Sequence, residues 1–244
     1  MAILKQSFLS AIQFLSIIPV GRHAQRLNAD ILIHFPLVGL LIGMLVAGWD
    51  YCLGFFCPDL LRSLLDVLLF AIITGALHLD GVADTADGLF SHRSIDQKLT
   101  IMRDSRTGAM GLIAIFFVLS LKWSSILSIP SELRPWILIL APSLARYSVL
   151  LGMKFLPYGR PEGGIASVFY CRSISQKCLM TILLPLIISV FMGWYCIWLW
   201  ISFCGWVIWI LLLYHWHVKC ITGDMMGAMI ELVETGLFIS FTLL

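Results

Sequence analysis

The sequence predicts an all-α, polytopic integral membrane protein: a bundle of about seven transmembrane helices that forms one domain over residues 1–244. Of the 244 residues, 60% are hydrophobic and only 12% are Asp, Glu, Lys or Arg, against about 25% charged residues in an ordinary soluble domain. Apolar stretches of about twenty residues, long enough to cross a bilayer as a helix, recur along the chain. These observations exclude soluble, disordered, collagenous and disulfide-stapled classes.

Seven apolar stretches are predicted to be the transmembrane helices, because each is long enough to span and carries few charges. They cover residues 31–50, 60–79, 110–129, 136–153, 179–197, 198–216 and 225–243. Almost no linker separates the fifth stretch from the sixth. This predicts a helical hairpin that turns near Gly193 or Trp194.

A further apolar stretch, Ser7 to Val20, precedes the first predicted span. It lacks a small-x-small cleavage site, so it is not predicted to be a signal peptide. Phe8, Ile12 and Leu15 share one helical face, which is typical of a helix lying in the membrane interface. The sequence leaves open whether this segment crosses the membrane.

The basic residues predict which side of the membrane each connecting segment occupies. Segments 21–30, 80–109, 154–177 and 218–224 contain eleven Lys and Arg residues, whereas the opposite side offers only Arg62 and Arg134. By the positive-inside rule the first set is cytoplasmic. Eight of the 14 carboxylates fall in the same segments. We therefore expect the chemically active face to be cytoplasmic.

The densest candidate site is the stretch from His78 to Gly88, in which Asp80, Asp84 and Asp87 are spaced i, i+4, i+7. On a helix this spacing places the three carboxylates on one face, where they repel one another. A hard divalent cation reverses that repulsion, and Mg²⁺ is typically held by one or two carboxylates together with substrate phosphates. The alternative is a solvated acidic helix end. His78 is a candidate substrate-binding residue at the head of the stretch.

The segment from residue 101 to residue 108 is a second candidate. Arg103 and Arg106 have the paired donors that hold phosphate oxygens, and Asp104 lies between them in the sequence. Asp104 is a candidate metal ligand or proton acceptor. The alternative for the arginines is that they are only positive-inside anchors.

Asp224 immediately precedes the last predicted span, which contains Glu231 and Glu234, and all three lie near one helical face. Carboxylates within a span need a cationic partner, a hydrogen-bonded position in the bundle or a water-filled cavity. Arg146, in the fourth predicted span, likewise requires an anionic partner. Arg160 lies in a glycine-rich segment, 158–164, for which a plain turn is the alternative.

The stretch Gly75 to Leu89 resembles the signature of the cobalamin synthase family, also called adenosylcobinamide-GDP ribazoletransferases. The resemblance covers nearly the whole chain in order, through the segments 14–19, 35–39, 101–106, 160–163 and 222–234. It implies a multi-pass enzyme of the bacterial cytoplasmic (inner) membrane. The enzyme would transfer the adenosylcobinamide phosphate moiety of adenosylcobinamide-GDP to α-ribazole or α-ribazole 5'-phosphate, releasing GMP in a late step of cobalamin biosynthesis.

The resemblance also implies Mg²⁺ as the cofactor, those two substrates and the lipid bilayer as partners, and no nucleic acid. The oligomeric state stays open, a homo-oligomer included. Our hypothesis is that Asp80, Asp84 and Asp87 hold one or two Mg²⁺ ions on the GDP moiety. Asp104 or Asp224 completes the metal shell or deprotonates the ribazole hydroxyl. The remaining candidates bind substrate or phosphate: His78, Arg103, Arg106, Arg146, Arg160, Glu231 and Glu234.

Two other classes of protein are alternatives. CDP-alcohol phosphotransferases and aspartate-rich prenyltransferases also use aspartate clusters and Mg²⁺ at a membrane surface. A cation transporter would instead place its acids near the bilayer midplane. The aspartates of residues 80–87 follow the end of a predicted span, which favours a transferase over a transporter.

Overall fold

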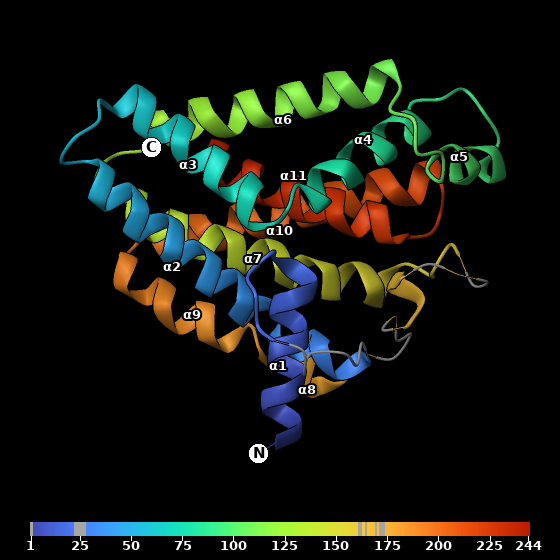
Figure 1. Cartoon of the computed structure of the whole chain (residues 1–244), viewed down its shortest axis with the longest axis horizontal. Coiled ribbons are helices and arrows are strands. Elements are labelled where there is room, and N and C mark those ends of the chain that lie inside the picture. Colours follow the sequence, from blue (N-terminus) through green and yellow to red (C-terminus); the bar gives the residue numbers. More distant parts are fainter. Residues whose placement is uncertain (1, 22–27, 161–162, 164, 169, 171–173) are drawn as a thin grey trace.

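The computed structural model describes the chain except for residues 1, 22–27, 161–162, 164, 169 and 171–173. Within these described residues it is helical and contains no β-strand (Figure 1), which confirms the predicted all-α membrane bundle. The helices are α1 (Ala2–Leu15), η1 (Ala29–His34), α2 (Phe35–Leu53), α3 (Asp59–Ile73), α4 (Leu77–Leu89), α5 (Ile95–Ile101), α6 (Ala109–Ser128), α7 (Arg134–Phe155), η2 (Ile165–Val168), α8 (Gln176–Met180), α9 (Leu183–Ser189), η3 (Val190–Met192), α10 (Tyr195–His217) and α11 (Gly223–Phe241).

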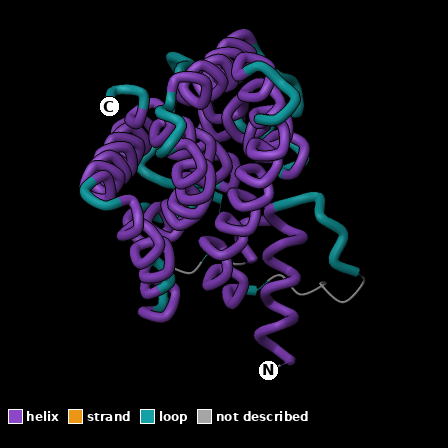
Figure 2. The backbone as a smooth tube through the Cα atoms, turned by 90° about the vertical axis from the view of Figure 1, so that its left-hand side faces the viewer, coloured by secondary structure: helices purple, strands orange, loops and turns teal. Residues whose placement is uncertain are grey.

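Four helical segments are long and apolar enough to cross a membrane: Ala29–Leu53, α6, α7 and α10. The pair α3 and α4 makes a fifth if it is counted as one span. Helix α11 matches the predicted stretch 225–243 in position and, at 19 residues, in length. The tube view shows how the long helices pack side by side, with α1 projecting from the bundle at the N-terminus (Figure 2).

The prediction of one continuous helix over residues 60–79 is wrong. Helix α3 ends at Ile73, and α4 starts at Leu77 at an angle of 88° to it. Gly75 and Ala76 between them have φ values of 59° and 56°. This left-handed conformation cannot continue a right-handed helix, so the chain turns before the aspartates begin.

The predicted span 179–197 is also wrong as a single helix, because the chain forms the short helices α8, α9 and η3 there. The predicted turn at Gly193 is confirmed: this residue has a φ of 63° and separates η3 from α10. Of the N-terminal stretch 7–20, residues 7–15 belong to α1 and residues 16–20 are not helical. With 14 residues α1 is shorter than a bilayer-spanning helix.

Helix α11 occupies the centre of the bundle and packs against α4, α6, α7 and α10. Nearly all of its side chains are buried, including those of Glu231 and Glu234. A helix that is buried on every side needs small residues or paired polar groups where other helices cross it. By contrast, α6 and α10 expose large apolar side chains such as Phe116, Phe117 and Ile201. This outward apolar surface suits a lipid bilayer.

Candidate functional site

The aspartates of α4 do form the helical stripe predicted from their spacing, but they face different surroundings. Asp80 is exposed, whereas Asp84 and Asp87 are partly buried. The Asp87 carboxylate accepts hydrogen bonds from the backbone N–H of Gly108 at 2.6 Å and of Gly111 at 2.9 Å. These amides belong to the N-terminus of α6, where unpaired N–H groups and the helix dipole favour a negative charge. Asp87 therefore caps α6.

The beginning of α11 lies directly against α4. A Cβ atom on Gly81 would stand 2.5 Å from the carbonyl oxygen of Asp224, so only glycine permits this approach. The Thr222 hydroxyl caps α11 by accepting from the N–H of Met225. The charges of Asp80, Asp87 and Asp224 all act on Asp84. The packing thus gathers carboxylates from two helices that are far apart in the sequence.

Arg160 is the cation of this carboxylate group. Its guanidinium lies 2.7 Å from the Asp224 carboxylate and also donates to the backbone carbonyl of Met102 at 3.1 Å. The N–H of Gly159 donates to the carbonyl of Ile221, which holds the Arg160 backbone beside the start of α11. Of the glycine-rich segment 158–164, residues 161, 162 and 164 lie outside the described residues.

In the segment between α5 and α6, two of the predicted site residues pair with each other. Asp104 and Arg106 form an ion pair of 2.7 Å with each other, and the Arg106 side chain is 87% exposed. Hydrogen bonds from Arg106 lower the pKa of Asp104 to about 2. Asp104 is thereby a weak proton acceptor. The charge of Arg103 acts on Asp224, so this arginine adds positive charge in the neighbourhood of the carboxylates.

Two neutral side chains in the adjoining loops also have shifted pKa values. Burial raises the pKa of the Tyr158 phenol and of the Cys220 thiol, although Arg160 lowers both to a smaller extent. Both groups are therefore protonated at neutral pH. Neither is suited to be a nucleophile in this state.

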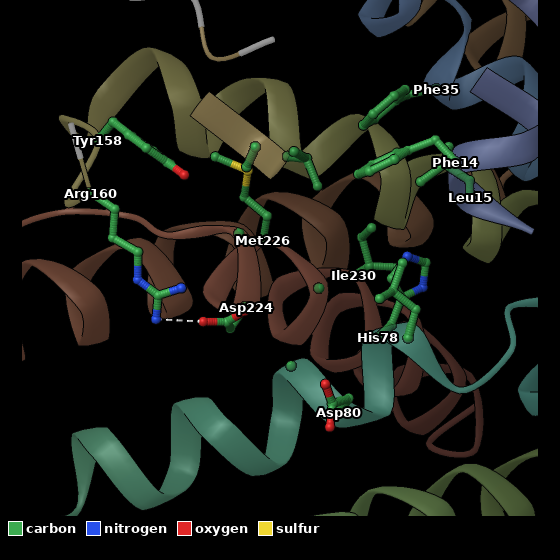
Figure 3. A pocket seen from close by; sticks show the side chains of 16 residues that line it. Phe14, Leu15, Phe35, His78, Asp80, Tyr158, Arg160, Asp224, Met226 and Ile230 are labelled. Carbon is green, nitrogen blue, oxygen red and sulfur yellow. Dashed lines mark ion pairs between the residues drawn. The ribbon is translucent and has the colours of Figure 1, made fainter. Parts of the chain in front are cut away.

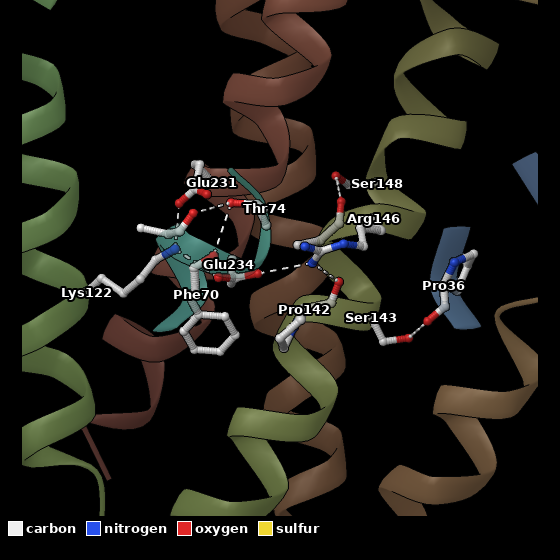
Figure 4. Close-up of polar contacts among 12 residues, drawn as sticks. Pro36, Phe70, Thr74, Lys122, Pro142, Ser143, Arg146, Ser148, Glu231 and Glu234 are labelled. Carbon is white, nitrogen blue, oxygen red and sulfur yellow. Dashed lines mark hydrogen bonds and ion pairs between the residues drawn. The ribbon is translucent and has the colours of Figure 1, made fainter. Parts of the chain in front are cut away.

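Glu231, Glu234 and Arg146 form a separate buried ion cluster (Figure 4). The Lys122 ammonium lies 2.5 Å from Glu231 and 2.8 Å from Glu234, and Arg146 lies 3.3 Å from Glu234. The four side chains are at most 6% exposed. The glutamates are thus hydrogen-bonded within the bundle, the alternative considered from the sequence, and Arg146 has the anionic partner that its position requires. None of the three predicted residues lines the cavity described next.

Lys122 was missed by sequence reasoning. A lone lysine in the middle of the apolar stretch 110–129 is a signal of the same kind as Arg146, since an intramembrane cation needs an anionic partner. The pairing depends on α6 lying beside α11, which the sequence does not show.

A cavity of about 190 Å³ opens beside the carboxylates (Figure 3). Asp80, Asp224 and Arg160 line one part of it, and His78 lines another together with apolar side chains. His78 is 3% exposed. The predicted residues Asp80, Asp224, Arg160 and His78 are therefore brought to one cavity.

The carboxylates at this site could hold a metal ion only together with a bound substrate that supplies further oxygen ligands. Among the described residues, no group of three or more His, Cys, Asp or Glu side chains is arranged to hold a metal ion. Asp87 is already engaged as a helix cap. In the described part of the chain no cationic side chain pairs with Asp80 or Asp84. Two free carboxylates suit Mg²⁺ if substrate phosphates and water supply its other ligands.

The fold and the site define a multi-pass helical membrane protein with an acidic cavity at the junction of α4 and α11. The chain belongs to the Cobalamin-5-phosphate synthase family, whose model matches residues 7–242. This confirms the resemblance seen in the sequence motifs.

Several relatives carry the name adenosylcobinamide-GDP ribazoletransferase. The protein from Desulforamulus reducens is 35% identical over 92% of this chain and 91% of its own length. That from Alkaliphilus metalliredigens is 34% identical over 97% and 94%, and that from Klebsiella pneumoniae 37% over 75% and 77%. No solved structure matches the chain significantly.

Proposed function

We propose that the protein is the transferase for which its relatives are named, joining the adenosylcobinamide phosphate group of adenosylcobinamide-GDP to α-ribazole or its 5'-phosphate. The observation that carries the proposal is similarity over nearly the whole chain to proteins of that name. The cavity beside Asp80, Asp84, Asp224 and Arg160 supports it, because phosphoryl transfer needs charge neutralisation and a proton acceptor at one place.

The reaction requires a ribazole hydroxyl to attack the phosphorus that bears the cobinamide group. A new P–O bond forms, the phosphoanhydride bond breaks, GMP leaves and the hydroxyl proton passes to a base. Asp224 is our candidate for the base, since it lines the cavity. The other candidate, Asp104, is held as a weak acceptor by Arg106. Arg160 positions the Asp224 carboxylate and offers its remaining donors to phosphate oxygens.

Mg²⁺ is the proposed cofactor, with Asp80 and Asp84 as its protein ligands. When bound, it would neutralise negative charge on the substrate phosphates. Asp87 contributes by holding the N-terminus of α6 against α4. This role replaces direct ligation in the three-aspartate hypothesis. Arg103 adds positive charge near Asp224.

We place the protein in the bacterial cytoplasmic membrane with this cavity open to the cytoplasm. The clustering of basic residues in the segments around the cavity supports that orientation. The transporter alternative is not favoured, because Glu231 and Glu234 within the last helix are paired in the Lys122 cluster. The rival transferases are not favoured by the family match.

The test is reconstitution of the purified protein in liposomes with Mg²⁺, adenosylcobinamide-GDP and α-ribazole 5'-phosphate. We expect GMP and a cobalamin 5'-phosphate product in equal amounts. Excess EDTA should stop the reaction and added Mg²⁺ should restore it. Absence of GMP from folded wild-type protein would refute the proposed activity. GMP release unaffected by EDTA would refute the proposed cofactor alone.

A further inference from the structure

The cavity has a polar part and an apolar part, and the apolar part is built from four elements (Figure 3). Phe14 and Leu15 of α1, Phe35 of α2, Val149 of α7 and Ile230 of α11 line it. The rings of Phe14 and Phe35 are stacked, with centroids 6.1 Å apart and an interplanar angle of 19°. Such a wall suits a flat aromatic group that packs against ring faces and aliphatic side chains.

His78 supplies a polar atom to this apolar part. It lies in the first turn of α4. Figure 3 shows it beside Leu15 and Ile230, with the Arg160–Asp224 pair further along the cavity. Its Nδ1 atom is buried and has no hydrogen-bond partner among the described residues. An unpaired buried nitrogen is costly, so its position at the cavity wall indicates a ligand atom that completes the bond.

The size of the cavity limits what enters it. Its volume of about 190 Å³ is below the range of about 300–1,000 Å³ that drug-sized ligands occupy, so it takes a fragment of a substrate. A corrin macrocycle is too large. Guanine carries several donors and acceptors, and the apolar wall around His78 would leave most of them unpaired. The group that best fits the apolar part is a flat, mainly apolar bicyclic ring system with one hydrogen-bonding atom.

We propose that this apolar part binds the dimethylbenzimidazole base of the ribazole substrate, with His78 donating from Nδ1–H to the ring nitrogen that bears no ribose. This inference rests on the proposed function and adds the binding mode of the acceptor. The base has one free ring nitrogen, which can accept from the unpaired Nδ1 of His78 in the apolar part. The ribose then extends along the cavity towards Asp224 and Arg160, where its hydroxyl must react.

The first test needs no variant. Wild-type protein in detergent is titrated calorimetrically with α-ribazole alone, and then with the riboside of 5,6-dimethylindole, in which C–H replaces the free ring nitrogen. Loss of one hydrogen bond that leaves a buried group unpaired should weaken binding about 5- to 10-fold. Equal affinities, or no binding of α-ribazole to folded protein, would overturn the proposal.

The second test repeats both titrations with His78→Leu. We expect weaker binding of α-ribazole and little or no discrimination between the two ribosides. Discrimination retained in His78→Leu would show that another group makes the contact and would overturn the role of His78. If His78→Leu does not fold, the ligand pair on wild type and the valine variants below still decide the matter.

The third test distinguishes the two substrates during turnover. Val149→Ala enlarges the apolar part, and Val207→Ala is its matched control, because Val207 is equally buried but lies on α10 away from the cavity. We expect Val149→Ala to raise KM for α-ribazole several-fold with KM for adenosylcobinamide-GDP unchanged, and Val207→Ala to change neither. A rise in KM for adenosylcobinamide-GDP alone would assign the cavity to the other substrate and overturn the proposal.

Failure of the proposed function is recognised separately. Wild-type protein that binds α-ribazole with the expected discrimination but releases no GMP would uphold the binding mode and refute the transferase activity. A wild-type protein that releases GMP but binds the two ribosides equally would uphold the transferase activity and refute the binding mode.

Discussion

The protein holds two groups of carboxylates on the same central helix, and they differ in how they are paired. Glu231 and Glu234 lie deep in the bundle, where Lys122 and Arg146 pair with them, and neither glutamate lines the cavity beside α4. At the start of the same helix, Asp224 and Asp80 line one cavity, and the charges of both act on Asp84 nearby. Arg160 pairs with Asp224 there. Buried charges that have partners belong to the packed structure, because removing one partner leaves the other uncompensated, whereas an excess of one sign at a cavity indicates a ligand.

The largest effect should come from breaking the matched group. Replacement of Lys122 by Met leaves two glutamates facing a single arginine in a buried setting, which we expect to cost about 3–5 kcal/mol of unfolding free energy. The measurement is thermal unfolding in detergent. The double variant Lys122→Met with Glu231→Gln removes one charge of each sign and should recover part of the loss. A Lys122→Met protein as stable as wild type would show that this cluster is not a structural one.

Substitutions among the carboxylates at the cavity should lower the enzymatic activity rather than the stability. Asp84→Asn removes a proposed metal ligand without changing side-chain size. We expect GMP release to fall by about 10²-fold or more, while the elution volume and thermal midpoint stay near those of wild type. Near-normal turnover would remove Asp84 from the site and would weaken the assignment of Mg²⁺ to α4.

Two arginines, one at the cavity and one at the surface, should differ in their effect on GMP release, and both effects should be smaller than that of Asp84→Asn. Arg160 contacts Asp224 at the cavity, whereas Arg106 pairs with Asp104 at the surface. Arg160→Gln should lower GMP release about 10-fold, and Arg106→Gln less than about twofold, because an exposed ion pair contributes little. Equal losses in the two variants would mean that the segment 102–106 moves to the cavity when substrate binds.

The smallest expected effect concerns Asp87. Asp87→Ala removes the carboxylate that caps α6 and should lower the unfolding free energy by about 1 kcal/mol. Asp87→Asn retains one acceptor and should lose less. A loss of activity in Asp87→Asn as large as that in Asp84→Asn would instead return Asp87 to the metal ligands.

The sequence predicted those features of the site that depend on neighbouring residues, but not the contacts between residues far apart in the chain. The i, i+4, i+7 spacing of Asp80, Asp84 and Asp87 predicted a helical stripe, because helix geometry depends on local sequence. It could not predict that Asp87 faces the amides of α6, since that contact joins residues more than twenty positions apart. The same limit hid Lys122, whose partners lie more than a hundred positions away.

The far end of the bundle shows this limit again. The sequence indicated only two isolated cations there, Arg62 and Arg134. In the structure both pair with Asp50, which lies 3.2 Å from Arg62 and 2.6 Å from Arg134, and Arg134 also contacts the fully buried Asp66 at 3.0 Å. These pairs join α2, α3 and α7. That end is therefore held together by charges that the spacing of residues did not connect.

The amino-acid sequence by itself determined that the protein lies in a membrane, that it is helical, which family it belongs to and that the α4 aspartates form one stripe. Composition, periodicity and sequence motifs are enough for this, because none of them depends on which helices pack together. Only the tertiary structure decided which carboxylates are neutralised and which remain free at a cavity. Pairing depends on which helices pack together, and α11 meets Lys122 of α6 at its middle but α4 and Arg160 at its start. The same helix thus carries a structural ion cluster and a candidate active site one above the other.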